Sequence, residues 1–130
     1  MKYLEGAIPK SKAGLRDLIS DTMLRAPRRQ FPDTEDFDGV FYSAVRGVEN
    51  LRNILGVAKA NQLLDMLAQA KNHYLASENR LGGALMEDTK MVLIGRQPWA
   101  YPKELYPWTV DSSLPEVSES DLLNKGVQDE

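Results

Sequence analysis

The chain has 130 residues, of which 42% are hydrophobic and 27% charged, and this is the size and composition of a single globular domain. It contains no cysteine, which excludes disulfides, thiolate zinc sites and thiol nucleophiles. The net charge is −3 and acidic residues concentrate after residue 95, a balance that argues against binding to nucleic acid. No apolar run approaches the roughly 20 residues of a membrane span, and residues 1–9 lack the apolar centre of a signal peptide. These features predict a soluble protein of the cytosol.

The first predicted helix spans residues 11–26. Leu15, Leu18, Ile19 and Met23 recur at helical spacing on one face. Pro27 should end the helix because proline lacks the amide donor and clashes with the preceding turn. The arginines at positions 25, 28 and 29 form the only basic cluster, and we expect them to lie in a solvated linker.

The second predicted helix begins at Asp33 or Thr34, either of which can accept hydrogen bonds from the free amides of a first turn. It should end at Gly56, the residue type that most readily turns the chain left-handed. Apolar residues repeat every three or four positions between these limits and predict a buried seam. The seam is Phe37, Phe41, Ala44, Val48, Leu51 and Leu55, widened by Val40, Val45 and Ile54.

A third helix is predicted over residues 57–76 and a fourth over residues 77–94. The third should bury a seam from Ala60 to Tyr74, with Met66 at its edge. The apolar register continues across Ser77, so one long helix is an alternative, but a helix of about 38 residues is improbable in a domain of this size. We therefore expect a break, with Ser77 and Glu78 capping the fourth helix. Gly82 and Gly83 then fall inside it, where close approach of another backbone would explain them.

The segment from Pro98 to Trp108 differs from the helices before it. It holds Trp99, Tyr101, Tyr106 and Trp108, which are four of the ten aromatic residues. Rigid aromatic side chains flanked by prolines suit a binding hot spot. The alternative is that the segment folds back and closes the open end of the helices, and both can hold together. Residues 109–130 are polar and acidic, with one helical turn expected near residues 121–124.

No arrangement of residues indicates catalysis, a metal or a cofactor. His73 is the only histidine, no carboxylate pair flanks it at ligand spacing, and we expect it on a helix surface. The carboxylate pairs at residues 36/38 and 87/88 are not expected to converge on a pocket. No nucleophile-elbow or phosphate-binding motif is present in the sequence. The chain is therefore not expected to be an enzyme.

The order of helices and several short motifs resemble one family. The resemblance covers about residues 12–95 and rests mainly on apolar positions and helix ends. The matching positions are residues 24–27, Tyr42-Ser43-Ala44, Glu49, Leu51, Ile54-Leu55, Lys71, Ser77-Glu78, Leu81, Ala84-Leu85 and Gly95. In these the chain resembles the small helical immunity proteins that protect bacteria from type VI secretion effectors that degrade NAD(P). The resemblance implies an all-helical protein that binds a toxin and performs no chemistry.

The sequence thus predicts an all-α fold, with a bundle of about four helices over residues 1–108 and an acidic tail over residues 109–130. The predicted function is that of an immunity protein, or antitoxin, which occludes a cognate protein toxin without nucleic acid, membrane or cofactor. A chaperone or adaptor for a secreted protein is the alternative, followed by a helical DNA-binding regulator. Two groups of residues are predicted to contact the partner, one acidic and one aromatic. They are Asp33, Glu35, Asp36 and Asp38, and Trp99, Tyr101, Tyr106 and Trp108.

Overall fold

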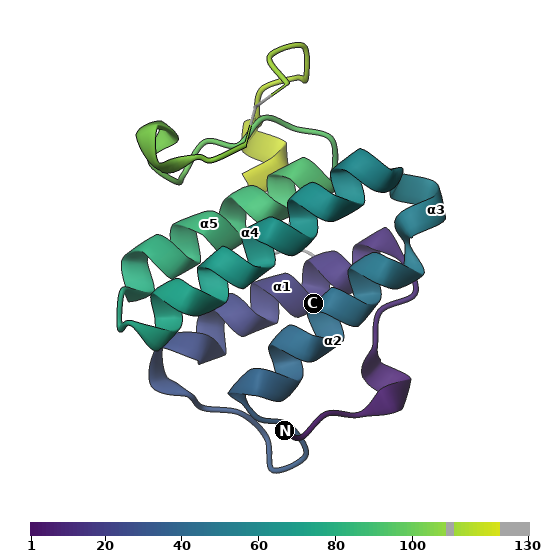
Figure 1. Cartoon of the computed structure of the whole chain (residues 1–130), viewed down its shortest axis with the longest axis vertical. Coiled ribbons are helices and arrows are strands. Elements are labelled where there is room, and N and C mark those ends of the chain that lie inside the picture. Colours follow the sequence, from purple (N-terminus) through teal and green to yellow (C-terminus); the bar gives the residue numbers. More distant parts are fainter. Residues whose placement is uncertain (109–110, 123–130) are drawn as a thin grey trace.

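Four long helices form the body of the molecule (Figure 1). The computed structural model describes residues 1–108 and 111–122, and these contain no β-strand. The long helices are α1 (Lys12–Arg25), α2 (Phe37–Asn50), α4 (Val57–Leu75) and α5 (Asn79–Leu93), and the single turn α3 (Arg52–Leu55) joins α2 to α4. Consecutive long helices run in opposite directions, and the packing α1–α2–α4–α5–α1 closes a ring. The predicted all-α bundle is confirmed.

A side chain caps the N-terminus of each of the first two long helices, α1 and α2. Ser11 caps α1, because its hydroxyl oxygen accepts the N–H of Gly14 at 3.0 Å. Asp36 caps α2, since its Oδ1 accepts the N–H of Gly39 at 2.7 Å and its own backbone is extended. The prediction that α2 begins at Asp33 or Thr34 is therefore wrong. Those two residues lie in a separate turn, and the side chain that accepts an amide of the first helical turn is that of Asp36.

The second predicted helix is interrupted at Leu51. The Leu51 N–H is shared between the carbonyls of Gly47 and Val48, which tightens the helix and lets the chain change direction while Leu51 stays in the core. α3 then carries Ile54 outward, so that Ile54 is 69% exposed rather than part of the seam. Gly56, at φ 88°, ends this segment as predicted.

The predicted break between the third and fourth helices is confirmed. Ser77 adopts φ 61°, and the N–H of Glu78 reaches back to the carbonyl of His73 at 2.8 Å, which closes the end of α4. Glu78 occupies the predicted N-cap position of α5, but no side chain there accepts an amide of the first turn, so the expected side-chain cap is not formed. The Glu78 carboxylate instead contacts the His73 ring.

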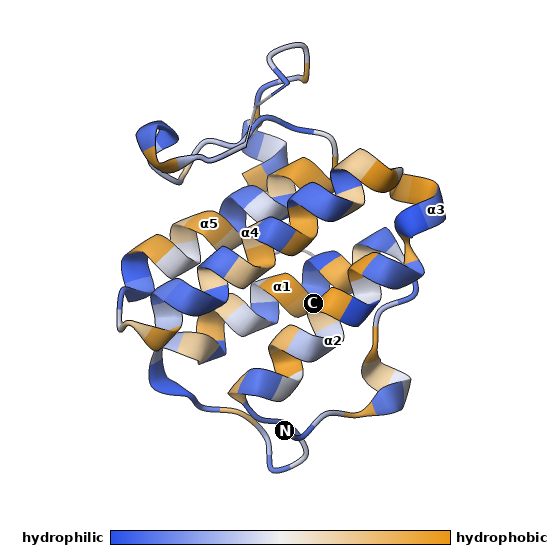
Figure 2. Cartoon of the chain, viewed as in Figure 1, coloured by the Kyte–Doolittle hydropathy of each residue, from blue (hydrophilic) through white to orange (hydrophobic). Residues whose placement is uncertain are grey.

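The core lies between the four helices, where the apolar stripe of each helix faces inward (Figure 2). Met66, expected at the edge of α4, is fully buried, because α5 covers that side of α4. α5 is the most enclosed helix, and residues 85–93 are all buried, including four polar or charged ones. The polar residues of this buried stretch are Glu87, Asp88, Thr89 and Lys90.

The two glycines of α5 face different surroundings. A Cβ atom on Gly82 would lie 3.0 Å from three carbons of the Tyr74 ring, whereas a Cβ on Gly83 would meet only the Tyr74 hydroxyl at 3.7 Å. The close neighbour at Gly82 is thus a side chain of α4 and not a backbone, which corrects the prediction. Tyr74 is fully buried and packs against Phe37 and Phe41, so the ring cannot move aside. Burial raises the pKa of Tyr74 to about 12.

This difference predicts opposite effects for two neighbouring alanine substitutions. Gly83→Ala should raise the free energy of unfolding by up to about 1 kcal/mol, because alanine restricts the unfolded chain and favours the helix. Gly82→Ala should lower it by about 1–3 kcal/mol, because the added methyl overpacks against the Tyr74 ring. Urea denaturation of both variants measures the two changes. Stabilisation by both substitutions would contradict the tight packing at Gly82.

Candidate binding surface

The segment after α5 is organised by one buried carboxylate. Asp88, which is fully buried on α5, accepts the backbone N–H groups of Trp99, Ala100 and Tyr101, each at 2.8 Å. The Tyr106 hydroxyl donates a fourth hydrogen bond to the same carboxylate. A buried carboxylate is costly unless donors surround it, and these four donors come from one short stretch of chain. The path of residues 99–106 is therefore fixed by Asp88.

The aromatic rings of the segment stack on one another. The Tyr101 and Tyr106 rings lie 5.4 Å apart and nearly parallel, and the Trp108 ring lies 5.0 Å from that of Tyr106. Burial, and secondly the hydrogen bond to Asp88, raise the pKa of Tyr106 well above its usual range. The prediction left open whether these residues bind a partner or close the bundle. Tyr101 is buried and joins the core, which establishes the second role for that residue.

A polar chain ties Tyr101 to α4. The Tyr101 hydroxyl lies 2.7 Å from Nε2 of His73 and accepts a hydrogen bond from Gln69 at 3.2 Å. The other ring nitrogen of His73 lies 2.8 Å from the Glu78 carboxylate. The expectation that His73 is an ordinary surface residue is wrong, because its side chain is mostly buried between two partners. His73 acts here as a link between the α4–α5 turn and the C-terminal segment.

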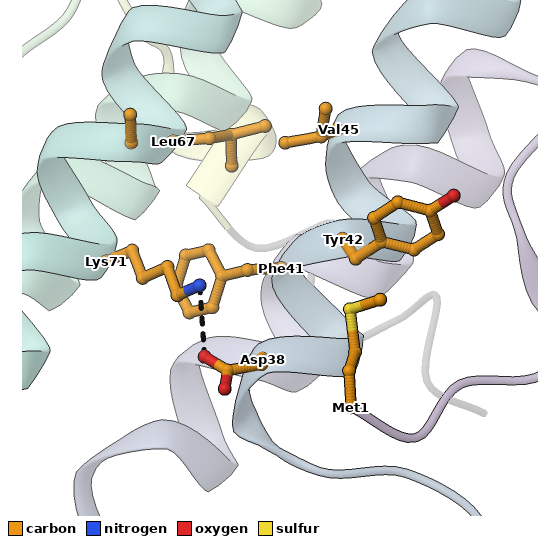
Figure 3. A pocket seen from close by; sticks show the side chains of 8 residues that line it. Met1, Asp38, Phe41, Tyr42, Val45, Leu67 and Lys71 are labelled. Carbon is orange, nitrogen blue, oxygen red and sulfur yellow. Dashed lines mark ion pairs between the residues drawn. The ribbon is translucent and has the colours of Figure 1, made fainter.

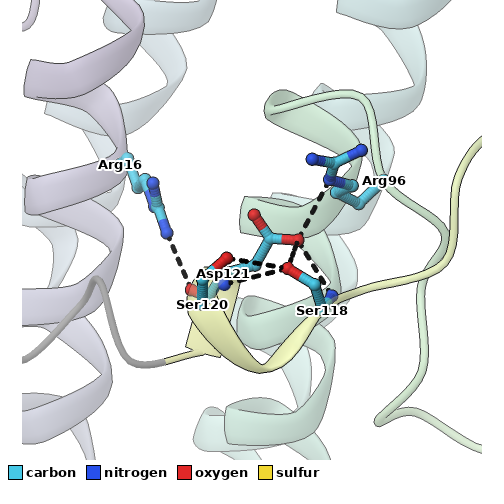
Figure 4. Close-up of polar contacts among 5 residues, drawn as sticks. All are labelled: Arg16, Arg96, Ser118, Ser120 and Asp121. Atoms are coloured by element: carbon cyan, nitrogen blue, oxygen red, sulfur yellow. Dashed lines mark hydrogen bonds and ion pairs between the residues drawn. The ribbon is translucent and has the colours of Figure 1, made fainter.

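A second carboxylate, that of Asp121, attaches the later part of the described chain, residues 118–121, to the bundle (Figure 4). Ser118 and Asp121 form a reciprocal capping box, in which the Asp121 carboxylate accepts the Ser118 N–H at 2.9 Å and Ser118 Oγ accepts the Asp121 N–H at 3.3 Å. Arg96 pairs with the same carboxylate at 3.0 Å. Arg16 of α1 donates to the Asp121 carbonyl at 3.1 Å. The hydrogen bonds from Ser118, more than Arg96, hold the pKa of Asp121 below its usual range.

This turn lies within the predicted acidic tail, residues 109–130. Its described part is helical over residues 119–122, which overlaps the turn expected over residues 121–124 at residues 121 and 122, while residues 123–124 lie outside the described part of the chain. Residues 109–110 and 123–130 lie outside the described part of the chain. Asp121 is buried against α1 and the end of α5, so this portion of the tail packs on the bundle.

Trp99 differs from the other aromatic residues because its side chain is 50% exposed while its backbone is held by Asp88. Trp99 lines one hollow, and a second hollow shares with it the wall formed by Gln97, Pro98 and Lys103. One hollow, of about 210 Å³, is completed by Trp99 and residues 116–117. The other, of about 310 Å³, is completed by Tyr106, Trp108 and Ser112. We call Trp99 and these two hollows the Trp99 surface.

The predicted acidic residues lie at the opposite end of the bundle from this surface (Figure 1). Asp36 caps α2 and lies 3.7 Å from the N-terminal amine, and hydrogen bonds from the backbone of Lys2 and Gly39 lower its pKa. Asp38 pairs with Lys71 at 3.0 Å. Asp33 and Glu35 make no ion pair within residues 1–108 and 111–122. The acidic and aromatic groups therefore do not form one continuous site.

Asp88, which holds the segment that carries Trp99, was considered in the sequence analysis only as one of a carboxylate pair and was not predicted to organise this segment. A signal was present, because Leu81, Leu85, Asp88 and Val92 follow one another at spacings of four, three and four on the inward face of α5. A carboxylate at such a position must find donors. Which donors it finds is not readable from the sequence, because they lie 11 to 18 residues further along the chain.

No group of histidine, cysteine or carboxylate side chains in the described part of the chain is arranged to hold a metal ion. None of the helices described is long and apolar enough to cross a bilayer. The chain matches no protein-family model, no curated protein and no solved structure at a significant level.

The role of Asp88 can be tested by Asp88→Asn. An asparagine amide would direct its NH₂ at a backbone N–H, so we expect a loss of about 2–4 kcal/mol in unfolding free energy and faster cleavage by trypsin at exposed Lys103. Urea denaturation and timed proteolysis measure the two effects. Glu104→Gln is the control, because Glu104 is an exposed acid of the same segment. Equal behaviour of the two variants would contradict the role given to Asp88.

The lowered pKa of Asp121 predicts a pH dependence. Because the folded pKa lies below the unfolded value of about 3.9, the contribution of Asp121 is complete above that pH and is lost as the pH falls through the folded pKa. Asp121→Asn should therefore melt at a lower temperature than the natural chain near pH 6. The gap between the two melting curves should close towards pH 2. A gap that stays constant over this range would show that the ionised form is not what stabilises the turn.

Proposed function

We propose that the protein is an immunity protein that binds a cognate bacterial toxin and covers its active site. The observation that carries the proposal is Trp99, a large side chain half exposed on a backbone that the buried Asp88 already holds in place. A rigid, exposed tryptophan loses little conformational freedom on binding and is the residue type most enriched at interface hot spots. The function requires binding alone, and a rigid, half-exposed tryptophan supports such a role.

The hollows beside Trp99 support the same proposal. They offer places for partner side chains beside the tryptophan. Lys103 lines both hollows, and Glu116 lines the one that Trp99 completes. An apolar anchor surrounded by polar groups is the usual arrangement of a tight interface. An immunity protein must bind at sub-nanomolar concentration, which corresponds to more than about 12 kcal/mol, and such affinity needs a central anchor of this kind.

The resemblance in residues 12–95 supports the choice of partner. We propose that the partner is a type VI secretion effector that degrades NAD(P). The two proteins would bind one another in the cytoplasm of the cell that produces this chain. Toxins that act on nucleotides hold phosphates and so present basic clefts. Asp33 and Glu35, which are not paired within the bundle, would then speed the encounter by electrostatic attraction, while Trp99 slows dissociation. Tyr101 and Tyr106 would act indirectly by holding the segment.

The test uses the proteins encoded beside this chain's gene, each purified as an inactive variant. One of them should bind, and its active form should be inhibited. Trp99→Ala should then speed dissociation by about 30-fold, equivalent to 2 kcal/mol, while the chain stays folded with only a small fall in melting temperature, because half of the residue is exposed and its backbone hydrogen bond to Asp88 is kept. Surface plasmon resonance measures the rate.

Leu24→Ala is the matched control, since Leu24 is also a large exposed apolar residue but lies on α1. Its dissociation rate should stay within about threefold of the natural chain, as expected for a residue outside the interface. Binding without inhibition of the partner would contradict an immunity function and favour a chaperone. An unchanged rate for Trp99→Ala would remove Trp99 as the anchor.

A further inference from the structure

The Trp99 surface carries one cation that the fold leaves without a counterion. Lys103 is exposed and lines both hollows. It forms no ion pair with any carboxylate of residues 1–108 and 111–122. Asp88, around which the segment is folded, is fully buried and accepts four other donors. A partner that docks on this surface therefore meets a positive charge that is still to be paired.

The turn that carries Lys103 is already fixed in the free protein. Residues 103–105 form one turn of 3-10 helix, and the N–H of Tyr106 reaches the carbonyl of Lys103 at 3.1 Å. On either side of the turn, the Tyr101 N–H and the Tyr106 hydroxyl donate to Asp88. A partner that binds Lys103 therefore restricts only the lysine side chain, which keeps the entropic cost of the contact small.

The larger hollow, of about 310 Å³, contains no acid to balance Lys103, because its other lining residues are neutral. The Gln97 amide nitrogen already donates to the carbonyls of Ser112 and Leu114, at 2.9 and 3.0 Å. A cleft with charge of one sign and apolar walls concentrates the electric field on what enters it. The hollow therefore favours an anion. The apolar walls are Pro98, Tyr106 and Trp108.

The hollow between α2 and α4 shows the opposite case (Figure 3). Its rim also carries a lysine, Lys71, but Asp38 of the facing helix pairs with that lysine at 3.0 Å. The two charges balance each other within the fold, so that hollow selects no charged group of a partner. Lys103 differs because the described part of the chain supplies no such carboxylate.

We propose that Lys103 pairs with a glutamate or aspartate side chain of the protein that docks on the Trp99 surface. The carboxylate lies in the larger hollow, and an apolar residue of the same protein packs on Trp99 across the wall that the two hollows share. This inference rests on the proposed function for the presence of a protein partner. It adds the charge by which that partner is chosen, since a basic residue at the same place would be repelled.

The charges at the two ends of the bundle would then orient the partner. Asp33 and Glu35, at the end opposite the Trp99 surface, attract a basic region, whereas Lys103 attracts an acidic one. A partner turned end for end would meet like charges at both places.

The probe is a displayed library of random peptides, selected in parallel on the natural full-length chain and on Lys103→Glu. Peptides enriched on the natural chain should share an acidic residue close to a large apolar one, and on Lys103→Glu a basic residue should replace the acid. The chain has a net charge of −3, so unspecific attraction would enrich basic peptides on both. For one acidic peptide, Lys103→Gln should weaken binding about three- to tenfold and reduce its dependence on salt, and Lys103→Glu should weaken it at least about 30-fold.

A charge exchange separates pairing from a structural role of the lysine. Replacing the acid of the peptide by lysine should restore binding to Lys103→Glu, which a structural role would not do. Lys10→Glu is the matched control, because Lys10 is also an exposed lysine of an irregular segment but lines neither hollow. It should change binding less than about twofold. Melting curves of both variants check that they are folded.

Three results would overturn the proposal: a selection that yields no enriched peptide, enrichment without an acidic residue, and equal binding of the acidic peptide to the natural chain and Lys103→Glu. Displacement of the peptide by free glutamate at equal concentration would assign the hollow to a small carboxylate instead. Failure of the immunity function looks different, because acidic peptides then bind at Lys103 while no toxin encoded beside the gene is inhibited. A toxin that is inhibited and binds Lys103→Glu as tightly as the natural chain would remove only the role of Lys103.

Discussion

The buried Asp88 carboxylate is the constraint on which the C-terminal part of the structure depends. An ionised group without water is unfavourable by several kcal/mol, so the fold must bring donors to it. The chain meets this demand by turning directly after α5 and directing three consecutive amides and the Tyr106 hydroxyl at one side chain. The carboxylate thereby specifies a single path for a segment whose regular structure is limited to one turn of 3-10 helix, Lys103–Leu105.

The segment is fastened to three helices by polar contacts. Asp88 belongs to α5, His73 contacts the Tyr101 hydroxyl from α4, and Arg16 reaches the Asp121 carbonyl from α1. Polar contacts of this kind are directional, whereas apolar packing alone permits sliding. They explain how a stretch rich in proline can present Trp99 in a defined position. Loss of the contacts of Asp121 with Arg16 and Arg96 should therefore affect the position of Trp99 as well.

The two groups of residues predicted to contact a partner lie at opposite ends of the bundle. Trp99 belongs to the segment after α5 and is half exposed there. The acidic group lies in the loop before α2 and in the first turn of that helix. A partner that contacted both groups would have to extend along the length of the bundle.

The sequence by itself determined the number of long helices, the break at Ser77 and most of the buried seam, because periodicity and chain-turning residues act over a few neighbouring positions. It did not determine that α2 is interrupted at Leu51 or that Met66 is enclosed, because both depend on how helices pack. For the binding surface, composition identified the aromatic segment but could not separate exposed Trp99 from buried Tyr101. The tertiary structure made that distinction, since the donors that satisfy Asp88 are brought to it only when the chain folds back across α5.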